Sequence, residues 1–361
     1  MLIINPGPNL EFLIHDLRKK MMHTSKIAKA IAAAAGSLTA GLLAVTPAYA
    51  YKVNDYLDIN GKVFADWSSV SGNPTTAEDD AASGFHLNRA YFEVRAKPTE
   101  EDMIRITLDQ KTSDGNVFVK YAYWQHEYSE AATIKVGQNQ TPLVDYIQTE
   151  LWGHRYVQKT FTDYFGAQTS SDLGVSVLGK AGDSFDYYVS MMNGEGYTHK
   201  TDGAGYAFMG RVEWHASGAH VGLFGHTEKD HAGITGYDPT RAEVYAWWKN
   251  DMVQIGGQYL TADDGDYAKT AGNTAKFKDG KGYNVLANIK VPAMGDKTTA
   301  FVRYDSMDEK DTGYDHTLSI AGVEFEAAKG VMMAVDYQSD DKGTPGSKSL
   351  DTIGVHGQFK F

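Results

Sequence analysis

Charged side chains of both signs recur at alternate positions within apolar segments, and they give the sequence its most specific chemistry. Arg89, Glu93 and Arg95 alternate with apolar neighbours, and Arg105 and Asp109 do the same in the next segment. A β-strand has a side-chain period of two, so each segment places charge on one face and apolar groups on the other. We expect the charged face to line a water-filled channel. The predicted lining consists of Arg89, Glu93, Arg95, Arg105, Asp109, Lys120, Lys135, Arg211, Glu213, Arg303 and Asp305.

Residues 141–166 lie between two such segments, show no alternation and have a helix-like centre at 144–149. A loop of this length is usually functional. We expect it to fold into a wide barrel and narrow the channel; an outward cap or a subunit contact is the alternative. The candidates for the constriction are Asp145, Glu150, His154, Arg155 and Lys159.

An enzyme is the main competing class of function. Ser190, His154 and Asp145 are residue types of a hydrolase triad, but no Gly-x-Ser-x-Gly or comparable motif accompanies them. A structural scaffold that holds a periplasmic partner is a further alternative. We therefore predict a protein that is not an enzyme.

Metal binding is the other chemistry that the residue types suggest. Histidine is a common ligand for transition metals, and four histidines fall in and around 204–216 and 218–228. Residues five or six apart on one strand do not converge on one ion, so this spacing argues against a site. The acidic run at 263–266 lacks the full spacing of a calcium loop, and the run at 78–80 is interpreted as a solvated loop. We predict no metal and no cofactor. The four histidines are His215, His220, His226 and His231.

The elements that must position these residues are antiparallel strands. Alternation and turn chemistry predict about 16 strands, an even number as bacterial single-chain barrels require. Short connections alternate, for the most part, with long polar ones, which is typical of an outer-membrane barrel with periplasmic turns and extracellular loops. The predicted strands span 56–67, 85–97, 103–112, 117–128, 132–140, 171–181, 184–193, 204–216, 218–228, 240–250, 251–262, 282–292, 297–306, 316–326, 329–338 and 350–361.

Both ends of the chain support export to an outer membrane. A basic stretch precedes the apolar run 30–45 and the small-residue site at 48–50, which predicts a cleaved signal peptide within residues 1–50. Residues 51–361 then form one barrel domain. The last strand alternates and ends on the aromatic Phe361, as closing strands of such barrels do. Aromatic residues near strand ends on the outward parity are predicted to form girdles at the membrane interfaces: Tyr121, Tyr123, Trp214, Trp248, Tyr259, Tyr304, Tyr337 and Phe361.

Composition excludes several classes of protein. The chain has no cysteine, so it offers neither disulfides nor thioether attachment of haem. Its net charge of −12 argues against nucleic acid as a partner. Beyond the leader we find no apolar run long enough for a membrane helix. Only helices and closed barrels satisfy their backbone hydrogen bonds in lipid, so an exported membrane protein of this kind must be a barrel.

Three pieces of the sequence resemble the phosphate-selective porin O and P family of trimeric outer-membrane channels: residues 85–98 with 103–109, residues 134–143, and residues 171–182 with 185–197. The resemblance implies a homotrimer of 16-stranded barrels in contact with outer-membrane lipid and lipopolysaccharide. It also implies an arginine ladder that favours anions such as phosphate. Here the basic residues are interleaved with acidic ones and the net charge is negative, which favours a weak cation preference. The sequence predicts passive diffusion of small polar or ionic solutes and leaves the sign of the selectivity open.

Overall fold

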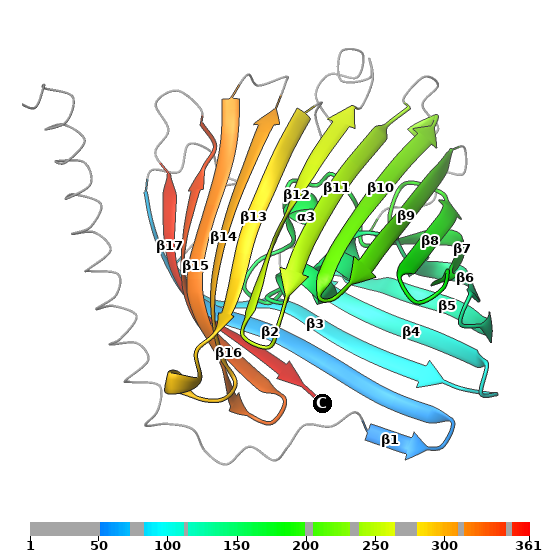
Figure 1. Cartoon of the computed structure of the whole chain (residues 1–361). Helices are drawn as coiled ribbons and strands as arrows, with labels where there is room; N and C mark the ends of the chain where they lie inside the picture. The colour runs from blue at the N-terminus through cyan, green and yellow to red at the C-terminus, as the bar shows by residue number, and fades with distance from the viewer. Residues whose placement is uncertain are drawn as a thin grey trace, which may run out of the picture.

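The computed structural model describes residues 51–72, 83–111, 115–198, 205–231, 238–263, 280–309, 314–343 and 349–361. Its strands form a twisted, closed wall in which the connections at one end are short (Figure 1). We call the end with the tight turns, such as 217–218, the short-turn end, and the opposite end the long-loop end. The predicted leader and the acidic run at 78–80 lie outside the described residues, as do residues 264–266 of the second acidic run.

Sixteen antiparallel strands close into a ring. Each of these strands pairs with its neighbours in sequence, and β17 pairs with β2 to close the barrel. The short strand β1 (Tyr51–Asn54) pairs with the start of β2. The ring consists of β2 (Leu57–Ser71), β3 (Gly84–Ala96), β4 (Asp102–Lys111), β5 (Val117–Ser129), β6 (Ala132–Gln140), β7 (Ser171–Lys180), β8 (Phe185–Met192), β9 (Tyr206–Ala216), β10 (Ala219–Lys229), β11 (Thr240–Lys249), β12 (Val253–Asp263), β13 (Gly280–Lys290), β14 (Thr298–Glu309), β15 (Tyr314–Ala328), β16 (Val331–Asp341) and β17 (Leu350–Lys360).

The closing seam joins the two ends of the barrel domain. Lys360 lies opposite Lys62 and Phe359 opposite Val63 in the register of β17 and β2. Gly61 and Phe361 exchange two backbone hydrogen bonds of 2.9 and 3.1 Å. A Cβ at Gly61 would lie 2.1 Å from the Phe361 ring, so the glycine makes room for the terminal aromatic residue. The C-terminal Phe361 is therefore part of the seam.

Alternation gives the wall an apolar outside and a polar inside. Phe92, Ile104 and Ile106 are exposed on the outer face, whereas Glu93 and Thr107 are buried on the inner one. The other outward aromatic side chains include Trp214, Trp248, Tyr259 and Tyr304, which are all exposed. In the parts of the chain that the structure describes, no helix has the length and apolar character needed to cross a membrane.

The sixteen predicted strands all match strands of the ring, whereas the prediction omitted β1. The outward orientation predicted for Tyr121 and Tyr123 is wrong, because their side chains are only 3% and 4% exposed and face the interior. The register between β4 and β5 shifts where Thr107 pairs with Tyr121 and Leu108 with Val119. Lys120 is thus the extra residue of a β-bulge, and a bulge reverses the parity that follows it.

The connection between β6 and β7 folds into the barrel. We call residues 141–170 the inward loop. It contains the helical turn α2 (Val144–Ile147), the π-helical turn η2 (Gln148–Trp152) and the helical turn α3 (Phe161–Tyr164). Figure 1 shows α3 behind the wall formed by β11 and β12, within the barrel. The predicted inward fold is confirmed, and the helix-like centre predicted at 144–149 coincides with α2 and the start of η2.

Candidate pore and its constriction

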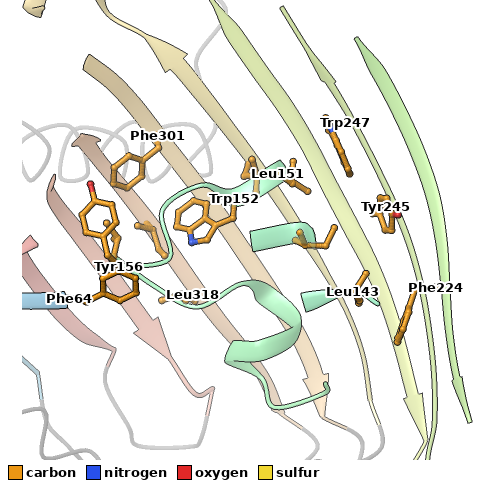
Figure 2. Close-up of a cluster of buried hydrophobic side chains, with 14 of the residues drawn as sticks. Phe64, Leu143, Leu151, Trp152, Tyr156, Phe224, Tyr245, Trp247, Phe301 and Leu318 are labelled. Carbon is orange, nitrogen blue, oxygen red and sulfur yellow. The ribbon is translucent and has the colours of Figure 1, made fainter. Parts of the chain in front are cut away.

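Apolar side chains fix the inward loop to one side of the barrel wall. Figure 2 shows Leu151 and Trp152 of the loop directed toward the strands, with Phe301 of β14 close to Trp152. The Trp152 and Phe301 rings lie edge to face with centroids 5.8 Å apart, and Trp152 is only 1% exposed. Burial of side chains this large contributes several kcal/mol of stability. The members of this cluster include Leu143, Ile147, Leu151, Trp152, Tyr156 and Val157 of the loop and Phe224, Tyr245, Trp247, Leu286, Phe301, Leu318 and Ile320 of the wall.

His154, predicted at the constriction, instead connects the loop to the wall. Its Nδ1 lies 3.0 Å from Glu324 Oε2 and its Nε2 lies 3.0 Å from Asn288 Oδ1. Tyr156 donates a second hydrogen bond of 2.7 Å to Glu324, and the His154 ring stacks on Phe301. Because it is buried under these partners, His154 acts as an anchor of the loop.

Further polar contacts hold the region around α3. Thr162 donates to Glu243 over 2.7 Å and Tyr164 donates to Asp340 over 2.8 Å. Arg303, paired with Asp305 at 2.8 Å, donates to the backbone carbonyl of Lys159. Arg303 and Asp305 therefore face the interior as predicted by parity, but the loop covers them.

Arg155 and Lys159 form ion pairs within the loop. Arg155 Nη2 lies 3.4 Å and Lys159 Nζ 3.7 Å from the carboxylate of Asp163. Burial acts to raise the pKa of the Asp163 carboxyl, but the neighbouring positive charges, first among them Arg155 and Lys159, outweigh it and hold that pKa below its usual value. Asp163 acts to raise the pKa of Lys159, yet burial and the repulsion of Arg155 lower it overall. The two charges of this segment are thus held in place by Asp163.

A cavity of about 770 Å³ lies between the start of the inward loop and the opposite wall. Eight basic side chains and three acidic ones line it, so basic side chains outnumber acidic ones by five although the whole chain is acidic. The basic residues are Lys62, Arg95, Arg105, Lys120, Lys135, Arg211, Lys329 and Lys360. The acidic residues are Glu93, Asp145 and Glu150.

Tyrosine rings hold several of these cations against the wall. The Arg105 guanidinium lies 4.2 Å from the centroid of the Tyr121 ring, and the Lys135 ammonium lies 5.3 Å from that of Tyr188. Arg211 lies 3.5 Å from the centroid of the Tyr146 ring on the loop. Cation–π contacts orient a charge without neutralising it. Arg105 and Arg211 also lie next to the carboxylates of Glu93 and Glu213, so the tyrosine rings orient these cations without replacing their acidic partners.

Acidic groups are placed both within the wall and on the loop. Glu93 accepts from Arg105 Nε over 2.7 Å and lies 2.6 Å from Arg95 Nε. On the loop, Asp145 accepts a hydrogen bond from the Tyr121 hydroxyl, and Glu150 lies 3.7 Å from Lys249. The loop acids thus lie across the cavity from a wall whose lining is mainly basic.

The other predicted residues lie outside this cavity lining. Arg89 pairs with Asp109 at 2.7 Å, and Tyr197 donates to the same carboxylate over 2.8 Å. Glu213 is buried next to Arg211, whose Nη1 lies 3.7 Å from Glu213 Oε2. These inward residues form contacts within the wall. Of the five loop candidates, Asp145 and Glu150 reach the cavity.

Three lysines of the cavity are not among the predicted lining residues, although the alternation of the last strand puts Lys360 on its inward face. Lys62 lies on β2, Lys329 follows β15 and Lys360 lies at the end of β17. The alternation of β2 and β17 was a usable signal for Lys62 and Lys360, because it puts both side chains on the inward face. Lys329 lies in a turn, where alternation gives no direction. The closing seam therefore contributes charge to the cavity as well as closing the wall.

The residues of the imagined hydrolase triad are not assembled. Ser190 Oγ has no hydrogen-bond partner among the described residues. His154 is engaged by Glu324 and Asn288, and Asp145 by Tyr121. Among the described residues, neither His154 nor Asp145 is therefore placed to activate Ser190 as a nucleophile.

Solved structures share this architecture. OmpF of Salmonella typhi in complex with daunomycin superposes with a TM-score of 0.64 at 14% identity, over 84% of this chain and 97% of that one. The fold is that of a Gram-negative outer-membrane porin. An anion-selective porin from Comamonas acidovorans gives a TM-score of 0.62 at 12% identity, over 84% of this chain and 99% of that one. The trimer form of OmpT from Vibrio cholerae gives 0.54 at 17% identity, with 84% and 99% covered.

Sequence comparison does not assign the chain to a family. No family profile matches the chain, and no curated protein matches it significantly. At 12–17% identity the porin structures establish the fold and leave the solute undetermined. One of them is described as an anion-selective porin.

Proposed function

We propose that the chain forms an outer-membrane channel through which small ionic solutes diffuse passively, with a preference for anions. The observation that carries this proposal is the cavity between the inward loop and the wall, with eight basic and three acidic side chains. Charge at the narrowest part of a pore affects selectivity more than the charge of the whole chain. The lining therefore supports an anion preference in place of the cation preference suggested by the net charge of −12.

The apolar outer face of the wall and the position of its short turns support an orientation of the barrel in the membrane. Its outer face exposes apolar side chains such as Phe92 and Ile106, with Trp214 and Trp248 near strand ends. We infer that residues 1–50 are a leader removed on export and that 51–361 insert into the outer membrane, in contact with its lipid and lipopolysaccharide. The short-turn end then faces the periplasm.

We further propose a homotrimer, supported by the trimer form in which the Vibrio OmpT has been solved. Membership of the phosphate-selective porin O and P family is a finer proposal. It has the support of the segment resemblance and of the basic cavity. This finer proposal states that inorganic phosphate binds in the channel.

The experiment is a planar-bilayer recording with the refolded chain 51–361, in chloride and then with added inorganic phosphate. We expect stable stepwise conductance, and phosphate should lower the chloride current in a saturable way if the finer proposal holds. Conductance without any effect of phosphate would support the channel and reject phosphate specificity. Absence of conductance from a chain folded by circular dichroism would reject the channel itself.

A further inference from the structure

Four side chains able to bind metal gather on the inner face of β8, β9 and β10, near the short-turn end. Asp186 lies opposite Glu213 in the register of β8 and β9, and His215 lies opposite His220 in the register of β9 and β10. Residues directly opposite on antiparallel strands share one face of the sheet. Positions 213 and 215 also share that face, because the side-chain period is two.

The side chains of this group are already in contact. His220 Nδ1 lies 2.8 Å from Glu213 Oε1, and His215 Nδ1 lies 3.2 Å from Asp186 Oδ2. The two imidazole rings stack with centroids 5.6 Å apart. One ligand atom from each of Glu213, His215 and His220 lies within 4.8 Å of the other two.

One atom of the group, Glu213 Oε2, is buried without a hydrogen-bond partner in the described part of the chain. Glu213 is only 1% exposed, and Arg211 Nη1, at 3.7 Å, is too far from Oε2 for a hydrogen bond. A buried polar atom without a partner costs free energy. A cation bound between the carboxylate and the imidazoles would supply the missing partner.

We propose that Glu213, His215 and His220 bind a divalent transition-metal ion of the Zn²⁺ class. Two imidazoles and one carboxylate are a ligand set that suits Zn²⁺, Cu²⁺ or Ni²⁺, whereas Mg²⁺ and Ca²⁺ prefer oxygen ligands throughout. Asp186 holds the ring of His215, as carboxylates next to metal-binding histidines do. Zn–N and Zn–O bonds are about 2.0–2.2 Å long, so small side-chain rotations bring the three ligands onto one ion.

The sequence argument against convergence of the histidines is corrected here. It considered residues on one strand, whereas the turn at 217–218 places His215 and His220 on neighbouring strands and opposite each other. The other two histidines contact Glu228: His226 Nε2 lies 3.4 Å and His231 Nδ1 2.6 Å from it. That second pair lies toward the long-loop end of β10 and provides a matched control.

The site adjoins the proposed channel. Arg211, which lies beside Glu213, lines the cavity and donates to the Pro142 carbonyl of the inward loop over 3.0 Å. A divalent ion on Glu213 would add positive charge behind this arginine. The proposal does not depend on conduction, since binding is measured on the folded chain directly.

The test is calorimetric titration of the refolded chain 51–361 with Zn²⁺, on the parent and on three single variants. His220→Gln and His215→Asn remove one ligand each but keep a side chain able to form hydrogen bonds. His226→Gln is the control. We expect one Zn²⁺ per chain, at least about tenfold weaker binding in either ligand variant, and unchanged binding in the control. Circular dichroism shows whether each variant is folded.

Electron paramagnetic resonance with Cu²⁺ gives an independent measurement. The parent should show two imidazole nitrogens bound to the ion, and each ligand variant should show one. Absence of Zn²⁺ binding to the parent, or binding that His220→Gln and His215→Asn leave unchanged, would overturn the proposal. A loss of affinity that is equal in His226→Gln would also overturn it, because it would indicate binding at the other histidine pair.

Discussion

Tyr121 of β5 donates its hydroxyl hydrogen to the carboxylate of Asp145 on the inward loop. The ring of Tyr121 also lies under the Arg105 guanidinium, 4.2 Å from ring centroid to Arg105 Cζ. One wall residue thus joins the acidic side of the cavity to its basic side. Asp145 Oδ1 has no hydrogen-bond partner among the described residues, so part of this negative charge is not compensated.

Asp145→Asn should make the channel more anion-selective. The substitution removes one of three acidic side chains at the cavity and keeps a carbonyl that accepts from Tyr121. Tyr121→Phe is the matched control, because it removes the hydrogen bond and keeps the charge. Reversal potentials in a salt gradient should move toward the anion limit in Asp145→Asn and move much less in Tyr121→Phe. Equal shifts would show that the contact matters more than the charge.

The double substitution Lys62→Gln and Lys135→Gln should move the reversal potential toward cations. Both lysines line the cavity, and their replacement leaves the Arg105–Glu93 pair intact. Lys290→Gln serves as the control because Lys290 is exposed at the short-turn end and does not line the cavity. A reversal potential unchanged by the double substitution would place the ion pathway elsewhere.

Trp152→Ala should loosen the inward loop. The side chain is 1% exposed and packs on Phe301, and truncation of a buried tryptophan costs about 3–5 kcal/mol. We expect larger and noisier single-channel conductance, because a loosened loop leaves the pore wider. Trp214→Ala, on the exposed outer face, should leave conductance unchanged. Identical recordings from the two variants would argue against the loop as the constriction.

Acid should weaken the ion pairs that Asp163 forms with Arg155 and Lys159 within the inward loop. The pKa of this carboxyl is lower in the folded protein than its usual value of about 3.9. The contribution of Asp163 to stability is therefore fully present above that usual value and is lost as the pH falls through the lower, folded value. Urea denaturation should show Asp163→Asn less stable than the parent at pH 6, with the difference shrinking below pH about 4. A stability difference between parent and variant that is the same at pH 6 and pH 3 would show that it does not come from the ionised Asp163 carboxylate.

Much of the wall was predictable because a half-buried strand shows its period directly in the sequence. The β3 and β4 segments illustrate this, since Phe92, Ile104 and Ile106 are exposed outside while Glu93 and Asp109 are buried inside. The inward fold of 141–166 was predictable from its length and its lack of alternation. These features depend on local sequence alone.

The rest depends on contacts that sequence spacing does not show. The bulge at Lys120 reversed the orientation of Tyr121 and Tyr123, and a bulge leaves no mark in the alternation of a single strand. His154 was assigned to the constriction because of its residue type, but its partner Glu324 lies 170 positions away. The meeting of His215 and His220 required the register of the β9–β10 hairpin.

The most direct test of the central claim is the reversal potential of the parent channel in a tenfold potassium chloride gradient. The claim is that the basic lining between the inward loop and the wall sets the selectivity, although the whole chain is acidic. We predict a potential of the sign that chloride preference produces. A potential of the opposite sign would contradict it and would assign the selectivity to the acidic surface.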